Sequence, residues 1–190
     1  MIIVPTPTLL TPRETLFHRS PESRFSFPTG VSADSIGNVF VADTYNHLIR
    51  HVHTNGTVRT LAGTLVLAET DSNGNALPGC PAPCLKGAKG FADGSLTTSK
   101  FFFPADVAID MGSGTVTVAD HNRIRRISLP SWVYAGTGIS TTQTVQSRNR
   151  VVTIAGTTTD GHADGIGQNV SLFLEVEREG ERGREIQFED

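Results

Sequence analysis

Two short polar clusters carry the side chains most able to bind a ligand, and each directly follows an apolar alternating run. The first cluster follows VFVAD and the second follows VTVAD. Carboxylate, amide and imidazole groups of this kind can hold a chain reversal through hydrogen bonds to the backbone, or they can contact a ligand from a loop. Both interpretations stay open. The candidate binding residues are Asp43, Tyr45, Asn46 and His47 in the first cluster, and Asp120, His121, Asn122 and Arg123 in the second.

Metal chemistry has little support in the sequence. His51 and His53 would share one face of a strand and could bind a metal, but a solvated outer strand explains them equally well and no third ligand is evident. The segments GFADG and GHADG supply one carboxylate each, Asp93 and Asp164, which is too few for the oxygen shell of calcium. They are better explained as glycine-rich turns. We predict no metal site and no cofactor.

The sequence also lacks a recognisable catalytic arrangement. It contains no GxSxG elbow, no phosphate-binding loop and no HExxH motif, so we predict no catalytic residues. The two cysteines, Cys80 and Cys84, lie four apart in GCPAPC and could form a local disulfide in an oxidising compartment. The sequence leaves their redox state and the compartment open.

Composition and charge argue against a nucleic-acid partner and give no sign of a membrane span. The chain has 190 residues, of which 37% are hydrophobic and 18% charged, as expected for a folded domain. Its net charge is −3, but residues 25–165 contain ten basic and ten acidic side chains, so no basic surplus favours a nucleic acid. No apolar run approaches the roughly 20 residues that span a bilayer. The acidity lies in residues 175–190, with seven acids and three arginines, which we expect to be poorly ordered or marginally helical.

The elements that position the two polar clusters are a repeat. Residues 25–64 match residues 101–129, and the match resumes at residues 150–157 after an insertion. The matched positions occur in the same order in both repeats, beginning with Phe27-Pro28 and Phe103-Pro104. Further matched pairs are Asp34 with Asp110, Asp43 with Asp120, Arg50 with Arg125, and Leu61-Ala62-Gly63 with Ile154-Ala155-Gly156. A fixed-order repeat of this length indicates a solenoid or a propeller.

Each repeat predicts four short antiparallel strands. Period-two alternation, Gly37-Asn38 and Asn55-Gly56 indicate strands joined by hairpin turns, and no useful helical periodicity is present. In this arrangement both polar clusters and the long link between the repeats lie at the same end of the sheets. The matched Arg50 and Arg125 predict pairing with an acidic neighbour. Trp132, in the insertion, could extend a hairpin, pack on an edge or contact a partner.

The ordered positions in residues 25–64 resemble the NHL repeat. The resemblance rests on GNVFVADTYNHLIR and GTVRTLAG, and it extends over about residues 25–165. The second copy departs from the pattern, because Asp106 replaces Gly30 and Asn122-Arg123 replaces Asn46-His47-Leu48. The resemblance implies an all-β fold built as a partial β-propeller of four-stranded antiparallel blades. Because two blades cannot close a ring that commonly has six, we expect an incomplete ring and a fragment of a larger propeller.

The resemblance divides the chain into six segments. The insertion 130–149 lies within blade 2. The segments are a proline-containing lead-in (1–24), blade 1 (25–64), an inter-blade loop (65–100), blade 2 (101–157), the lead-in to a third repeat (158–174) and a charged tail (175–190).

The resemblance implies a non-catalytic scaffold that binds a protein or a small-molecule ligand. One alternative is part of a metal-dependent propeller enzyme, similar to a lyase or lactonase, and another is RNA binding. We also expect His47 to pack beside the next blade. We expect the isolated chain to self-associate, because two blades leave open edges and apolar outer faces, with Val31, Val41, Val107 and Val118 exposed.

Overall fold

The computed structural model describes residues 17–19, 24–67, 85–133, 149–157, 161 and 165–169. Cys80, Cys84, most of the insertion and the charged tail lie outside these residues. The local disulfide and the expected behaviour of the tail therefore stay predictions.

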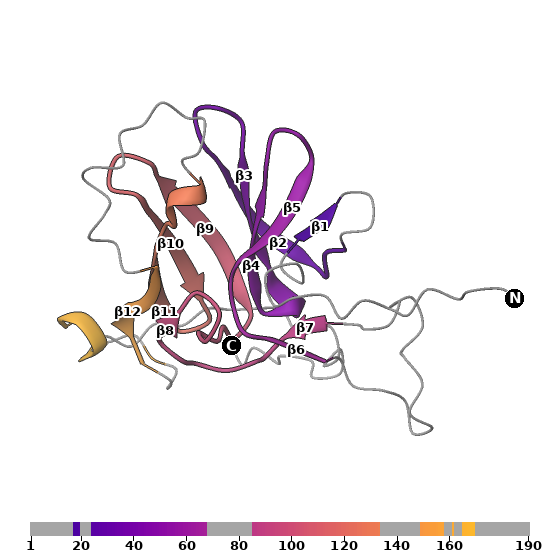
Figure 1. Cartoon of the computed structure of the whole chain (residues 1–190). Helices are drawn as coiled ribbons and strands as arrows, with labels where there is room; N and C mark the ends of the chain where they lie inside the picture. Colours follow the sequence, from indigo (N-terminus) through magenta and orange to yellow (C-terminus); the bar gives the residue numbers. More distant parts are fainter. Residues whose placement is uncertain are drawn as a thin grey trace, which may run out of the picture.

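The fold is all-β and forms two adjacent blades of a partial β-propeller (Figure 1). Each repeat builds one antiparallel sheet whose central strands follow one another along the chain. The first sheet, blade 1, has the order β1-β5-β4-β3-β2, and its strands are β1 (Phe17–Arg19), β2 (Pro28–Ala33), β3 (Val39–Asp43), β4 (Leu48–Val52) and β5 (Thr57–Ala62).

The second sheet, blade 2, repeats this arrangement. Its order is β8-β12-β11-β10-β9, and its strands are β8 (Gly94–Ser95), β9 (Pro104–Asp110), β10 (Thr115–Asp120), β11 (Arg123–Ser128) and β12 (Arg150–Gly156). The insertion therefore separates β11 from β12, as the sequence predicts. Gly37 and Gly56, with φ of 90° and 82°, occupy the hairpin turns of blade 1, where a side chain would be strained.

Each blade has a fifth strand that the sequence analysis does not anticipate. β1 pairs with β5, and the two-residue β8 pairs with β12, so both extra strands lie at the outer edge of a sheet. Their hydrogen bonds satisfy backbone groups that the outermost strand would otherwise leave unpaired. The four predicted strands of each blade are present. The fifth strand is not predicted, because segments this short carry no usable alternation.

The link expected as a loop, residues 65–100, also contains secondary structure. β6 (Leu65–Leu67) and β7 (Leu85–Gly87) form a two-stranded antiparallel sheet, and β8 follows them. The link is tied to the end of blade 1, because the backbone N–H of Gly63 donates to the carbonyl of Leu96 and that of Thr64 to the carbonyl of Ser99, both at 2.8 Å.

The hydrophobic core lies between the two sheets, which pack face to face as expected. Val107 and Val118 pair across β9 and β10, so they share the face of blade 2 that turns toward blade 1. Phe40 and Ala42 of β3 are fully buried in the same cluster. The remaining buried members are Ile49, Leu61, Ala62, Phe101, Val116, Ile127, Leu129, Val133 and Val151.

The expected exposure of four valines is only partly observed. Val31 is 65% exposed, but Val41, Val107 and Val118 are 6%, 4% and 0% exposed. That expectation is wrong for these three. Val107 and Val118 lie on the inner rather than an outer face, because the sheets pack with the front of one against the back of the other. Val31 keeps one apolar contact point for the self-association that we expect.

The inner strands of the two blades approach closely at Gly30. A Cβ atom at this position would overlap the backbone of Asp106 and lie 2.7 Å from the carbonyl oxygen of Ala105. Two hydroxyl groups of blade 1 donate to β9 near this point: Thr29 of β2 to the carbonyl of Ala105 at 2.6 Å, and Thr44, after β3, to that of Pro104 at 2.7 Å. The absence of a side chain at Gly30 is therefore a condition for this junction.

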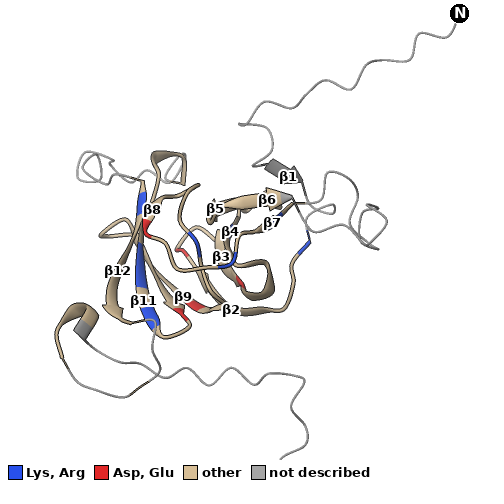
Figure 2. Ribbon diagram, turned by 90° about the horizontal axis from the view of Figure 1, so that it is seen from below, with Lys and Arg blue, Asp and Glu red and all other residues tan. Residues whose placement is uncertain are grey.

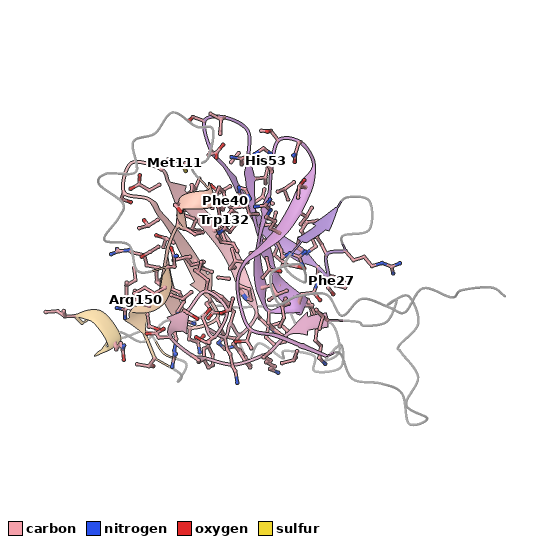
Figure 3. All side chains as sticks on the ribbon, in the orientation of Figure 1. Phe27, Phe40, His53, Met111, Trp132 and Arg150 are labelled. Carbon is pink, nitrogen blue, oxygen red and sulfur yellow. The ribbon has the colours of Figure 1, made fainter. Side chains whose placement is uncertain are left out.

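Trp132 closes the other end of the interface between the blades. It lies in the short 3-10 helix η2 (Ser131–Val133), and its ring is 5.5 Å from that of His51 in blade 1 and 5.4 Å from the guanidinium carbon of Arg59 (Figure 3). Trp132 thus packs across the blades, a role that differs from the three left open by the sequence. Among the described residues, no helix is long and apolar enough to cross a membrane.

His51 is buried beneath this tryptophan, so a solvated position is the wrong explanation for it. Its side chain is 2% exposed, its ring lies 5.0 Å from that of Phe40, and neither ring nitrogen has a hydrogen-bond partner within the described part of the chain. Burial, and then the neighbouring His53, lower the pKa of His51 to about 4. His53 is partly exposed and accepts a hydrogen bond from the backbone N–H of Asn55 through Nδ1 at 3.2 Å.

Replacing Gly30 by Ala should destabilise the blade junction. The added Cβ meets backbone atoms, which cannot rotate away, so we expect a loss of about 2 kcal/mol or more in the free energy of unfolding. The measurement is a urea titration. Gly112→Ala is the control, because its Cβ would meet only the side-chain carboxylate of Asp110, at 3.2 Å. Equal losses in the two variants would contradict the close approach at Gly30.

Replacing His51 by Phe should stabilise the protein more at acidic pH than at neutral pH. The folded-state pKa of His51 is lower than its pKa near 6.5 in the unfolded chain. As the pH falls below 6.5, only the unfolded chain takes up the proton, so the wild-type protein loses stability. The difference in unfolding free energy between variant and wild type should therefore grow by about 2 kcal/mol from pH 7 to pH 4.5. Carboxylate groups also titrate in this pH range, but they do so in both proteins. Their contribution to the unfolding free energy therefore cancels in the difference. A difference that is constant with pH would refute the buried neutral state.

Candidate functional site

The loops that carry the predicted binding residues gather at one end of the two blades. These loops are the β3–β4 connection with the 3-10 helix η1 (Thr44–Asn46), the β10–β11 turn and the segment 85–103. Figure 2 views the molecule from this end. The segment 85–103 packs directly on the first loop, because a Cβ atom at Gly87 would overlap the carbonyl oxygens of Asn46 and His47. We call this end the loop face.

A buried carboxylate organises each blade at the loop face. Asp43 Oδ1 accepts a hydrogen bond from the backbone N–H of Ser26, and Asp120 Oδ1 accepts one from that of Phe102, each at 2.7 Å. Both aspartates are fully buried. Acceptance of backbone hydrogen bonds is one of the two roles that the sequence leaves open for these residues. The donors, however, belong to the segment that enters the first strand and not to the turn itself.

The anchored segments hold two phenylalanines in an uncommon conformation. Phe27 and Phe103 have φ of 46° and 55°, in the left-handed region that bulky residues rarely adopt. Each directly follows the residue whose N–H the buried carboxylate accepts. The carboxylates therefore help to maintain the chain reversal that places an aromatic ring at the loop face.

Arg125 is the centre of the network in blade 2. Its side chain is 0% exposed, and it donates at 2.8 Å to Asp120 Oδ2, to Asp93 Oδ1 and to the carbonyl of Ala92. Burial raises the pKa of Asp120 to about 6, although the N–H of Phe102 and the Arg125 guanidinium act in the opposite direction. For Asp93, burial raises the pKa, but hydrogen bonds from Thr153 and the charge of Arg125 outweigh it, so the net pKa is lowered.

The matched ion pair in blade 1 is weaker. Arg50 is 5% exposed, and its nearest approach to Asp43 is 3.6 Å. Burial raises the pKa of Asp43, and here a single distant guanidinium opposes it along with hydrogen bonds from Ser26 and Asn46. The predicted pairing of both arginines with acidic neighbours is confirmed, with much better geometry for Arg125.

His47 packs beside the next blade, as the sequence predicts. Its ring lies 4.6 Å from that of Phe103, and its Nδ1 accepts a hydrogen bond from the backbone N–H of Phe103 at 3.2 Å. Burial, followed by the charges of Lys89 and Lys86, lowers the pKa of His47 to about 4. The neutral ring is thus matched to its role as an acceptor between the blades.

The other predicted residues divide between support and surface. Asn122 is buried, and Asn46 donates through Nδ2 to Asp43 Oδ2 at 2.9 Å. Tyr45 is 43% exposed. His121 is half-buried and lies 4.8 Å from the ring of Phe102, and Arg123 is half-buried over the ring of Phe91. A direct contact with a ligand is therefore open to Tyr45, His121 and Arg123, and their binding role stays a prediction.

An aromatic group that the sequence pattern did not indicate surrounds these residues. Phe91, Phe102 and Phe103 contact the predicted residues at the loop face, and Phe27 lies 4.9 Å from Tyr45. The available signal was FFFP at 101–104 and FSFP at 25–28, where aromatic residues gather just before a strand rather than alternating within it. No group of three or more potential metal ligands occurs among the residues that the structure describes.

A comparison with protein families identifies the first repeat. The model described as "NHL repeat" matches residues 25–52, which span β2, β3 and β4 together with the first buried carboxylate. Residues 25–52 therefore match an NHL repeat. The second blade reproduces the arrangement of this NHL repeat, with Asp120, Arg125 and Phe103 at the places of Asp43, Arg50 and Phe27.

Comparison with solved structures gives a distant likeness. One similar structure is a structural genomics protein of unknown function from Bacteroides thetaiotaomicron VPI-5482, with 22% sequence identity and a TM-score of 0.40. The similarity covers 54% of this chain and 20% of that chain. No curated protein sequence matches the chain.

Replacing Arg125 by Met should destabilise the protein more than Arg50→Met. Removal of Arg125 leaves Asp120 buried without its countercharge, so we expect a loss of about 3–5 kcal/mol. Removal of Arg50 breaks one long contact, so about 1–2 kcal/mol is expected. Urea unfolding of the two variants at pH 7 gives the comparison. Equal losses, or a larger loss for Arg50→Met, would contradict the asymmetry between the two blades.

Proposed function

We propose that the chain is a non-catalytic NHL-repeat β-propeller scaffold that binds a protein partner or a small-molecule ligand at the loop face. The observation that carries this proposal is the contrast between buried and surface groups. The ionisable groups most suited to chemistry, Asp43, Asp120 and Arg125, are buried in structural hydrogen bonds. The groups left near solvent at the loop face are mostly aromatic or basic, and the exposed carboxylate there, Asp93, is engaged by Arg125 and Thr153. This suits binding better than acid–base catalysis.

Two alternatives receive less support from the described residues. A metal-dependent lyase or lactonase needs several ligands around one ion, and the described part of the chain brings no three such side chains together. RNA binding needs a basic surplus, whereas residues 25–165 contain equal numbers of basic and acidic side chains. We therefore favour the scaffold.

The proposal is tested by comparing the two ends of the blades as binding surfaces. A photo-crosslinking phenylalanine analogue replaces Tyr45 at the loop face, or Ile36 in the β2–β3 turn at the opposite end. The two sites are matched, because Tyr45 and Ile36 are 43% and 44% exposed. We expect discrete crosslinked species in a cell extract from position 45 and not from position 36, identified by mass spectrometry.

The outcome separates the loop face from the rest of the surface. Equal crosslinking from both positions, or crosslinking from position 36 alone, would contradict the proposed function. Crosslinks at position 45 between two copies of the chain would replace the proposed partner by self-association. Melting curves of both proteins check that the substitutions leave the fold intact.

A further inference from the structure

The aromatic side chains of the loop face form a continuous series, which we call the aromatic ladder. Its members come from the entry segments of both blades, the two turns and the link between the blades. Successive ring centroids are 4.9 Å apart for Phe27–Tyr45, 5.4 Å for Tyr45–Phe103, 5.1 Å for Phe103–Phe102, 4.8 Å for Phe102–His121 and 4.8 Å for Phe102–Phe91. Phe27 is 62% exposed, so one end of the ladder is open to solvent.

Two cations rest on the rings of the ladder. Lys89 Nζ lies 4.6 Å from the ring centroid of Phe102 and 5.0 Å from that of Phe103, and the guanidinium carbon of Arg123 lies 4.4 Å from that of Phe91. The rings of Phe91 and Phe102 stack on each other. The two positive charges are therefore held on one aromatic pair, in positions that cation–π attraction fixes without an anion.

These cations have no direct acidic partner in the part of the chain that the structure describes, although the charges of Asp120 and Asp93 act on Arg123 from a greater distance. Neither Lys89 nor Arg123 forms an ion pair there, whereas Arg50 and Arg125 both do. The acidic side chains beside the ladder are already engaged. Asp43 and Asp120 are fully buried, and Asp93 holds Arg125 and the backbone and hydroxyl of Thr153.

We propose that the aromatic ladder is the docking surface for an acidic peptide segment that carries aromatic or aliphatic side chains. This inference rests on the proposed function and specifies the partner of the same face. The carboxylates of the peptide would pair with Lys89 and Arg123, while its apolar side chains would pack on Phe27 and Tyr45. We choose an acidic peptide on the basis of charge complementarity, because cations that are held in place without a direct acidic partner favour an anionic ligand.

The ring geometry favours a peptide over a single-stranded nucleic acid. Bases bind by stacking on open ring faces along a basic groove. Here the contacts Tyr45–Phe103, Phe103–Phe102 and Phe102–His121 are edge-to-face, and Lys89 covers the faces of Phe102 and Phe103. Such a surface offers mainly ring edges, which suit side chains better than stacked bases.

The test uses defined peptides and the complete chain. The first probe is a fluorescein-labelled peptide built from Glu-Phe-Glu-Gly units, and the matched probe has Gln in place of Glu. Fluorescence anisotropy should show binding of the Glu peptide at least about tenfold tighter than binding of the Gln peptide, and the difference should shrink with added salt. Lys89→Gln and Arg123→Gln should each weaken binding of the Glu peptide about threefold to tenfold.

Arg126→Gln is the control variant, because Arg126 is exposed on β11 and its side chain points to the opposite face of the sheet from Arg125. It should leave binding unchanged. Equal binding of both peptides, or no effect of Lys89→Gln and Arg123→Gln, would overturn the inference. Tighter binding of a labelled oligouridylate than of the Glu peptide would also overturn it, in favour of a nucleic acid.

The result is distinguishable from the test of the proposed function. Crosslinking at position 45 together with failure of the Glu peptide would refute the acidic partner and leave the loop face as a binding surface. Failure of both experiments would refute both proposals. Melting curves of the Lys89 and Arg123 variants should match that of the wild type, since both side chains can change without opening the core.

Discussion

The structure depends on a carboxylate that is removed from water at the end of the second strand of each repeat. Asp43 and Asp120 each accept the backbone N–H of the residue that precedes the left-handed phenylalanine. Burying a carboxylate is costly unless hydrogen bonds and a countercharge compensate it. These compensating groups come from the segment that enters the first strand and from the third strand. The carboxylate therefore connects both segments to the end of the second strand. One interaction thus fixes the end of the sheet at which the exposed loops lie.

The buried carboxylate is compensated more fully in blade 2 than in blade 1. In blade 2, Arg125 connects Asp120 to Asp93 and to two backbone carbonyls, and it lies over the buried ring of Phe101. In blade 1, Arg50 reaches Asp43 only at 3.6 Å and lies over the partly exposed Phe25. The link between the blades supplies the difference, because Asp93 and Ala92 belong to it. Blade 2 is therefore stabilised partly by chain that lies outside its own repeat.

Local patterns in the sequence were enough to predict the central strands, and long-range contacts account for most of what was missed. The alternation of VFVAD and VTVAD, with Gly37 and Gly56 in turns, predicts strands that the structure confirms. The matched arginines and His47 could be assigned because the repeat shows which positions face a neighbour. The backbone donor to each aspartate could not be assigned, because Ser26 and Phe102 approach the carboxylates only once the strands of each sheet have paired. The burial of His51 depends on Trp132, which arrives from a segment about eighty residues later with no periodic signal.

The close approach at Gly30 gives the two blades a fixed order. The matched position in blade 2 is Asp106, and the face of blade 2 turned away from blade 1 has Thr117 and Arg126 where blade 1 has the buried Phe40 and His51. A sheet that approached this far face as blade 2 approaches Gly30 would meet a residue with a side chain, Asp106, at the matched position, and a polar surface. The junction is thus directional and not transferable: exchanging the two modules, or adding a second copy of blade 2 in tandem, would not reproduce it. The order of the two blades along the chain is therefore set in part by the absence of a side chain at Gly30.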